Sequence, residues 1–320
     1  PEMTGSLVLR HRVVAETRRF FDEMDFVEVE TPILTRSTPE GARDFLVPSR
    51  LHRGSFYALP QSPQLFKQLL QVAGLGRYLQ IARCFRDEDL RADRQPEFTQ
   101  VDIEASFVEE EDIYVLIEGL FARIFPLVGI TPPSSFPRLA YDEALERFGT
   151  DRPDGRFGME LVELGPACDG CGFRILEEAA VSGRVKGLVV EGGAEISRKQ
   201  LDGLGEFVKA FGAAGLLWFK RTADGIASPA KKALGEEGVS RFLDMAGARE
   251  GDILLAIGAD EKVVFAALGA LRMEIARERG LIPAARHEFF WVTDFPLLEW
   301  DDDDRRFHAM HHPFTSPKIE

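Results

Sequence analysis

The sequence predicts an α+β fold in which helices flank an antiparallel sheet. Residues 77–86 and 98–107 alternate apolar and polar side chains, which is the pattern of two strands that each bury one face. Residues 6–24 place apolar side chains along one face of a helix, and 109–125 and 262–279 are two further predicted helices. Short apolar runs, among them 253–257 and 289–293, predict more strands. Together these segments define the α+β class.

The composition describes a globular chain of 320 residues, long enough for about two domains. Its 45% apolar content supports a sizeable core, and because it has no run of 18 apolar residues we expect no membrane span. We also expect no leader peptide. Three cysteines argue against a disulfide framework and favour a reducing, cytoplasmic location. A net charge of −14 excludes a generic basic nucleic-acid binder, so RNA would need a local basic patch.

The first elements in chain order are a helix, a short strand and a loop. Ser6 is a candidate N-cap for the helix over 6–24, and the strand at 26–30 ends at Thr31–Pro32. In the loop over 37–44, Gly41 permits the backbone freedom of a hinge, although an ordinary surface turn is the alternative. Residues 45–47 and 56–59 are predicted strands.

A helix is predicted to begin near Gln61, with Ser62 as N-cap, Pro63 at the first helical position and Gly74 at the exit. Gln64 and Lys67 are three residues apart and share a face of this helix. A lysine in the first turn opposes the helix dipole slightly, which hints at a function. An exposed lysine without a function is the alternative.

The two strands at 77–86 and 98–107 form the central predicted hairpin. Its apolar face consists of Leu79, Ile81, Phe85, Val101, Ile103, Ala105 and Phe107. Its polar face consists of Tyr78, Gln80, Cys84, Arg86, Gln100, Asp102, Glu104 and Ser106. The loop at 87–96 is too long and too charged for a tight turn. Such a loop at the end of a polar sheet face is typical of a binding site, and a solvated hairpin is the alternative.

After the helix at 109–125, the sequence predicts a connector at 131–137, a short helix at 141–148 and a second connector at 150–157. Glycine then becomes frequent from 158 to 285. Here Ser197 opens a helix to about 211 with capping-box spacing, and 216–220 and 253–257 are strands. Cys168 and Cys171 have the spacing of a metal-binding pair, but without a second pair we favour ordinary loop thiols. Strands at 289–293 and 297–300 precede an acidic turn at 301–304.

The hairpin carries a long sequence motif: Phe85-Arg86-Asp87-Glu88, then residues 91–100, then Asp102-Ile103-Glu104. This motif resembles the second signature motif of the class II aminoacyl-tRNA synthetases, in the form found in the bacterial aspartyl enzymes. The resemblance implies a class II antiparallel sheet in a catalytic domain at 1–157, with the bacterial insertion domain at 158–285 and a return to the catalytic domain at 286–320. The first helix, strand and Pro32 resemble the first motif, which implies a homodimer; plain core packing is the alternative.

The resemblance also implies roles for individual residues. An aspartate site is implied at Glu40, Ser62, Gln64, Lys67, Arg86, Asp102, His311 and His312. An ATP site is implied at Arg86, Asp87, Glu88, Gln95 and Phe98, and contacts to the tRNA acceptor end at Arg91 and Arg94. In this assignment Arg86 is the catalytic residue. Lys67 faces the substrate's side-chain carboxylate, and Asp102 takes its ammonium together with Glu40. For the histidines at 308–312 a metal cluster is the alternative.

The implied reaction joins L-aspartate to the α-phosphate of ATP, expels pyrophosphate, and then transfers the aspartyl group to tRNA(Asp). Mg²⁺ is expected with the triphosphate. The family's main metal ligands would lie beyond residue 320, so we expect no metal site within this chain. The family's third motif and anticodon-binding barrel are not found, and Gly269–Arg272 is only a superficial match. We therefore expect an excerpt of a longer enzyme, with little activity alone.

Two other functions stay open from the sequence. One is a class II relative without synthetase activity that serves as an RNA-binding or regulatory protein. The other is a relative that activates asparagine. The sequence does not decide whether tRNA(Asn) is also charged.

Overall fold

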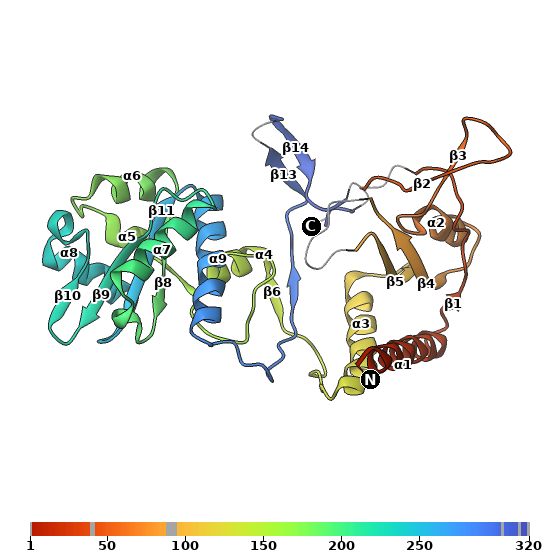
Figure 1. Ribbon diagram of the computed structural model, residues 1–320, viewed down its shortest axis with the longest axis horizontal. Helices are drawn as coiled ribbons and strands as arrows, with labels where there is room; N and C mark the ends of the chain where they lie inside the picture. Colours follow the sequence, from red (N-terminus) through yellow and green to blue (C-terminus); the bar gives the residue numbers. More distant parts are fainter. Residues whose placement is uncertain (1, 39–41, 88–94, 302–303, 313–314, 319–320) are drawn as a thin grey trace. The chain divides into compact units, whose positions relative to one another are not determined.

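The computed structural model describes residues 2–38, 42–87, 95–301, 304–312 and 315–318. They fold into two compact units, Pro1–Ser135 and Phe136–Glu320. Both units combine helices with mainly antiparallel strands, which confirms the α+β prediction (Figure 1). Among the described helices, none has the length and apolar character needed to cross a membrane.

The first unit is built around the predicted hairpin. Its elements are α1 (Glu2–Glu23), β1 (Val27–Glu28), β2 (Leu46–Pro48), β3 (Phe56–Ala58), α2 (Gln64–Val72), β4 (Arg77–Phe85), β5 (Glu97–Ala105), α3 (Glu110–Ile124) and a 3₁₀ turn at Phe125–Val128. Strand β4 pairs antiparallel with β5 and parallel with β1. Strands β2 and β3 form a separate antiparallel pair.

Helices α1 and α3 cover the apolar face of the β4–β5 hairpin. The buried cluster consists of Phe20, Phe21, Phe26, Leu79, Leu116 and Leu120, with Ile103 and Ala105 packed against it. Phe21 contacts Phe20 and Phe26 edge-on, with ring centroids 5.3 and 5.0 Å away. A capping box between Glu109 and Asp112 starts α3. Leu79, Ile103 and Ala105 of the predicted apolar face therefore pack in the core of this unit, whereas the prediction is wrong for Val101 and Phe107, which are 45% and 107% exposed.

Two predicted helix caps are wrong. Helix α1 begins at Glu2, and the Ser6 hydroxyl donates to the Glu2 carbonyl inside the helix. Helix α2 begins at Gln64 with Pro63, not Ser62, in the N-cap position, because the Pro63 carbonyl accepts the first helical hydrogen bond from Lys67 N–H. The predicted exit is confirmed, since Gly74 follows the helix with a φ of +94°, a conformation that favours glycine.

The second unit contains a five-stranded antiparallel sheet between two helical layers (Figure 1). Its strands, in spatial order, are β10 (Gly225–Ala227), β9 (Leu217–Thr222), β11 (Ile253–Ala259), β8 (Arg184–Val190) and β7 (Leu161–Glu163). The helices on one face are α7 (Arg198–Lys209) and α9 (Glu261–Glu278). Those on the other are α5 (Gly165–Cys168), α6 (Arg174–Ser182) and α8 (Lys231–Met245). A 3₁₀ turn, Gly193–Glu195, precedes α7.

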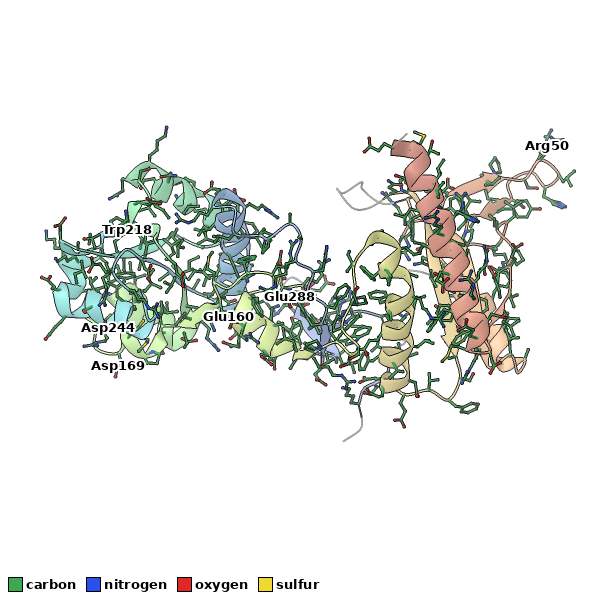
Figure 2. All side chains as sticks on the ribbon, turned by 90° about the horizontal axis from the view of Figure 1, so that it is seen from below. Arg50, Glu160, Asp169, Trp218, Asp244 and Glu288 are labelled. Carbon is green, nitrogen blue, oxygen red and sulfur yellow. The ribbon has the colours of Figure 1, made fainter. Side chains whose placement is uncertain are left out.

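Strand β11 explains the continuous apolar run that the sequence shows there. Ile253, Leu255 and Ile257 face α7 and α9, whereas Leu254 and Ala256 face the opposite helical layer. Side chains fill the space on both faces of the sheet (Figure 2). A strand buried on both faces is apolar throughout, so its sequence loses the alternation of a half-buried strand.

Within the described ranges, the rest of the second unit consists of four short strands and one helix outside the five-stranded sheet. Strand β6 (Arg138–Ala140) pairs parallel with β12 (Trp291–Thr293), and α4 (Tyr141–Phe148) follows β6 directly. Strands β13 (Leu298–Asp301) and β14 (Arg306–Ala309) pair antiparallel, and the predicted acidic turn at 301–304 falls between them in the sequence, with residues 302–303 outside the described part of the chain. The structure groups residues 136–157 and 286–320 with the sandwich in one unit. The domain boundaries at 157/158 and 285/286 stay a prediction.

The two cysteines with metal-pair spacing are buried free thiols. Cys168 ends the short helix α5 instead of lying on a loop, and its thiol donates to the Leu164 carbonyl. Burial, and secondarily the neighbouring Cys171, raises the pKa of the Cys168 thiol to about 12. At neutral pH this thiol is protonated and therefore a poor metal ligand or nucleophile.

An ionic network joins α4 to strand β8 inside the second unit. Lys186 is buried and donates to Glu146, which also accepts from Arg184 at 2.6 Å. Burial alone would raise the pKa of Glu146, but the hydrogen bond and charge of Lys186, together with Arg184, lower it. A lowered folded-state pKa stabilises the fold above the ordinary glutamate pKa, and this stability is lost as the pH falls through the folded value.

We therefore expect Glu146→Gln to destabilise the second unit at neutral pH by about 0.5–1 kcal/mol, since Lys186 loses its nearer charged partner and the half-exposed site is screened by solvent. The difference from the unchanged chain should shrink as the pH falls below the ordinary glutamate range. All three tryptophans, Trp218, Trp291 and Trp300, lie in the second unit, so their fluorescence during urea unfolding reports on it. Glu237→Gln, at an exposed site on α8, is the control. A pH-independent difference would contradict the assigned role of Glu146.

Candidate active site

The polar face of the β4–β5 hairpin is largely withdrawn from solvent, with Gln100, Glu104 and Ser106 half-buried. Tyr78, Gln80 and Asp102 are each at most 9% exposed. Helix α2 packs over this face and presents Lys67, the one buried residue of the helix. Leu65, Leu69 and Val72 of the same helix are exposed. A helix that buries its lysine and exposes its leucines reverses the usual preference, which points to a requirement other than stability.

The Lys67 cluster consists of Lys67, Asp102 and Glu104. The Lys67 ammonium lies 3.1 Å from Asp102 Oδ1 and 3.2 Å from Glu104 Oε2. An ammonium has three N–H groups, so one remains for a further acceptor such as a substrate carboxylate. The cluster carries one positive and two negative charges, and this imbalance favours a cation beside the carboxylates.

Asp102 is the most constrained carboxylate of the cluster. Burial raises its pKa, whereas the charge and hydrogen bond of Lys67, and to a smaller extent the Tyr78 hydroxyl, lower it, and the net shift is upward. Its second oxygen, Oδ2, is buried and has no hydrogen-bond partner among the described residues. A buried carboxylate oxygen without a donor costs about 1–3 kcal/mol or more. An ammonium group bound at Oδ2 would remove that cost.

Arg86 lies at the end of the same strand pair, beside Phe98. Its guanidinium carbon is 5.1 Å from the centroid of the Phe98 ring, and its backbone N–H donates to the Pro96 carbonyl. Within the described ranges, Nε of Arg86 is buried and without a hydrogen-bond partner. A planar guanidinium with an unused donor is suited to bind carboxylate or phosphate oxygens through two parallel hydrogen bonds.

Gln61 anchors described residues of the loop over 37–44, for which the sequence leaves a hinge and an ordinary surface turn open. Its side-chain amide accepts from Ala42 N–H at 2.9 Å and donates to the Ala42 carbonyl at 2.8 Å. It also donates to Asp44, which in turn accepts from Ser37. The backbone N–H of Asp87 donates to the Arg43 carbonyl at 3.0 Å. These bonds connect the loop over 37–44 to the start of the charged loop.

The other predicted site residues are distributed as follows. Glu40, Glu88, Arg91 and Arg94 lie outside the described residues. Ser62 and Gln64 are half-buried at the start of α2, and Ser62 lines a cavity of about 250 Å³. Asp87 and Gln95 are exposed. The structure therefore brings together Lys67 with Asp102, and Arg86 with Phe98.

His311 and His312 are exposed and belong to the second unit, where the His311 ring lies 4.8 Å from that of Phe295. Their place beside the residues of the first unit stays a prediction. In the β13–β14 hairpin, ligand atoms of Asp301, Asp304 and His308 lie within 4.8 Å of one another. His308 Nε2 also accepts a hydrogen bond from the Arg306 guanidinium at 3.2 Å, so this ring nitrogen already has a cationic donor.

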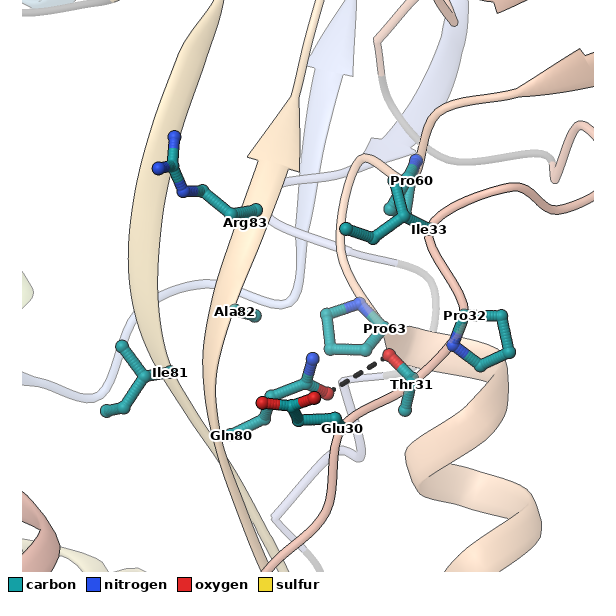
Figure 3. A pocket seen from close by; sticks show the side chains of 10 residues that line it. All are labelled: Glu30, Thr31, Pro32, Ile33, Pro60, Pro63, Gln80, Ile81, Ala82 and Arg83. Carbon is teal, nitrogen blue, oxygen red and sulfur yellow. Dashed lines mark hydrogen bonds between the residues drawn. The ribbon is translucent and has the colours of Figure 1, made fainter.

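Sequence reasoning missed three residues that organise the site. The sequence indicates Gln61 only as part of a helix start, and Tyr78 and Gln80 only as members of a strand face. The Tyr78 hydroxyl donates to Gln80 Oε1 at 2.6 Å, and Thr31 Oγ1 donates to the same oxygen at 3.0 Å (Figure 3). The one available signal was a run of polar residues opposite an apolar face.

Comparison with known proteins gives one consistent result. The family model for tRNA synthetases class II (D, K and N) matches residues 1–320. An aspartate–tRNA(Asp/Asn) ligase of Halothermothrix orenii is 54% identical over 321 residues, which cover 100% of this chain and 54% of that protein. An aspartate–tRNA ligase of Exiguobacterium sibiricum is 52% identical over 323 residues, covering 100% of this chain and 55% of that protein. The chain spans about half the length of the curated relatives it matches.

Proposed function

Because the chain belongs to the class II tRNA synthetases of the D, K and N group, we propose that the full-length protein is an aspartate–tRNA ligase. It activates L-aspartate with ATP and transfers the aspartyl group to tRNA(Asp). The observation that carries this proposal is the buried Lys67 cluster, which offers a cation to a substrate carboxylate and carboxylate oxygens to an ammonium. Aspartate carries both kinds of group.

The proposed first step is attack by the substrate's α-carboxylate on the α-phosphorus of ATP, with pyrophosphate as leaving group. Both reactants are anions, so positioning and fixed positive charge supply most of the catalysis. Arg86 binds one oxygen of the substrate carboxylate and one of the α-phosphate, and it stabilises the negative charge that builds up on the phosphate oxygens. Phe98 stacks on the adenine. Asp102 and Glu40 bind the substrate ammonium, and His311 and His312 contact the substrate or the loop at 37–44.

The remaining assignments follow the same proposal. Asp87, Glu88 and Gln95 hold the nucleotide, and Arg91 and Arg94 contact the acceptor end of the tRNA. Mg²⁺ enters with ATP and takes most of its ligands from phosphate and water. The protein acts in the cytoplasm, where its three free thiols stay reduced.

We also propose a homodimer through α1 and the Pro32 segment. Apolar side chains are exposed along α1 at Met3, Leu7 and Val8, and next to Pro32 at Ile33 and Leu34. Such a surface is typical of a subunit contact.

The test is ATP–pyrophosphate exchange by the full-length protein with aspartate, with asparagine and without amino acid. We expect exchange that depends on aspartate and is at least tenfold weaker with asparagine. Absence of exchange would support a relative that has lost synthesis and binds RNA. Preference for asparagine would support an asparagine-activating relative. Charging of tRNA(Asp) and tRNA(Asn) transcripts then decides the tRNA range, which differs among the relatives' names.

A further inference from the structure

Tyr78, Gln80 and Thr31 form a hydrogen-bond arrangement to which the proposed reaction assigns no role. Tyr78 is fully buried on β4, and its hydroxyl has a single proton to donate. That proton goes to Gln80 Oε1, at 2.6 Å. Gln80 is also buried, and the same oxygen accepts from Thr31 at 3.0 Å (Figure 3).

Asp102 is the competing acceptor for the Tyr78 proton. In the β4–β5 register Tyr78 is opposite Glu104 and Gln80 is opposite Asp102, so Tyr78 and Asp102 are diagonal neighbours on one face. Burial, then the charge of Asp102 and then hydrogen bonding to Asp102 raise the pKa of Tyr78, so the hydroxyl stays protonated at neutral pH and lies within reach of both acceptors, Gln80 and Asp102. A charged acceptor normally binds a phenol more strongly than an amide oxygen does. Yet Asp102 Oδ2 has no partner in the described part of the chain.

We propose that Gln80 is a positioning residue: by accepting the Tyr78 proton it keeps Asp102 Oδ2 open for the ammonium group of the amino-acid substrate. The inference rests on the proposed function, because it assigns the ammonium to Asp102. Thr31 supports the arrangement by holding Gln80 with its oxygen toward the phenol. The site thus keeps one buried carboxylate oxygen without a donor until the substrate supplies one.

The test uses Gln80→Leu in the full-length protein, because leucine has a similar size and no acceptor. The Tyr78 hydroxyl is then expected to turn to Asp102 and to compete with the ammonium. We expect KM for aspartate in pyrophosphate exchange to rise about threefold to tenfold, the range of one hydrogen bond, with kcat within about twofold.

The decisive variant is the double substitution Tyr78→Phe with Gln80→Leu. It removes the competing proton, so KM should return to within about twofold of the unchanged protein. Thr31→Val removes the second donor to Gln80 but leaves the Tyr78 bond, so it should raise KM by less than Gln80→Leu does. Thermal unfolding of each variant verifies that it is folded.

A purely structural role for Gln80 predicts a different result. The single and double variants would then both lose activity, with no recovery in the double variant, and this outcome would overturn the inference. An unchanged KM in Gln80→Leu would overturn it as well. Failure of the proposed function is distinguishable, because the unchanged protein would then show no aspartate-dependent exchange.

Discussion

Replacing Lys67 with methionine is expected to lower aspartate activation by the full-length protein about tenfold to a hundredfold, and asparagine activation much less. Aspartate and asparagine differ by a carboxylate against an amide, and a charge-assisted hydrogen bond contributes about 1.5–3 kcal/mol. Methionine keeps the length of the side chain and removes the charge. The measurement is kcat/KM in pyrophosphate exchange with each amino acid.

Arg86→Lys is the matched comparison for Lys67→Met. It keeps the charge but removes the second parallel hydrogen bond, which serves groups that aspartate and asparagine share. We expect it to lower activation with both amino acids by similar factors. If Lys67→Met also lowered both equally, Lys67 would only hold Asp102 and Glu104 in place, and specificity would depend on other residues.

The second large effect is expected at Arg272, where methionine should destabilise the second unit by about 3–5 kcal/mol. Arg272 is 1% exposed, and its guanidinium donates to the carbonyls of Asp154, Phe157, Gly158 and Met159 at 2.8–3.0 Å. Its charge also lies 4.0 Å from the Phe157 ring centroid. Removal takes the charged donor from four carbonyls of the connector, and a hydrogen bond to a charged group contributes about 1.5–3 kcal/mol.

The measurement for Arg272→Met is urea unfolding of the 320-residue chain, followed by tryptophan fluorescence. Arg277→Met is the control, because it makes the same replacement on the same helix at a residue whose side chain is 66% exposed. The control should change the free energy of unfolding by less than about 0.5 kcal/mol. Equal effects at both positions would show that the carbonyl contacts of Arg272 contribute little.

The β4–β5 hairpin was predictable because alternation along a strand is a local signal. Leu79, Ile103 and Ala105 pack in the core as expected. The burial of the polar face was not predictable, since it depends on α2, whose packing direction is set by contacts distant in sequence. Lys67 and Asp102 are 35 residues apart; the resemblance to a family implied that both belong to the aspartate site, but their direct pairing was not predicted.

Residues that hold other residues in place were the hardest to find. Gln61 acts through backbone groups 19 residues away, and Gln80 is held by Thr31, 49 residues away, so no local sequence pattern shows either contact. In the sequence, Arg272 is only a superficial match to a phosphate-binding motif. The structure instead shows a buried residue that binds the connector at 154–159, and composition does not distinguish these two roles of an arginine.

The parallel pairing of β6 with β12 has a consequence for the length of the chain that connects them. The two strands and α4 share a small core of Leu139, Ala144 and Phe148, with Phe290 and Val292 packed against it. A parallel pair requires a crossover of about a dozen residues or more, which α4 nearly supplies by itself. Lengthening a connection costs only about 0.6 kcal/mol per doubling. The connection between Gly149 and Glu288 can therefore change in length at little entropic cost to the strand pair, as long as the contacts of α4 with the sandwich, such as Glu146 with Lys186, are kept.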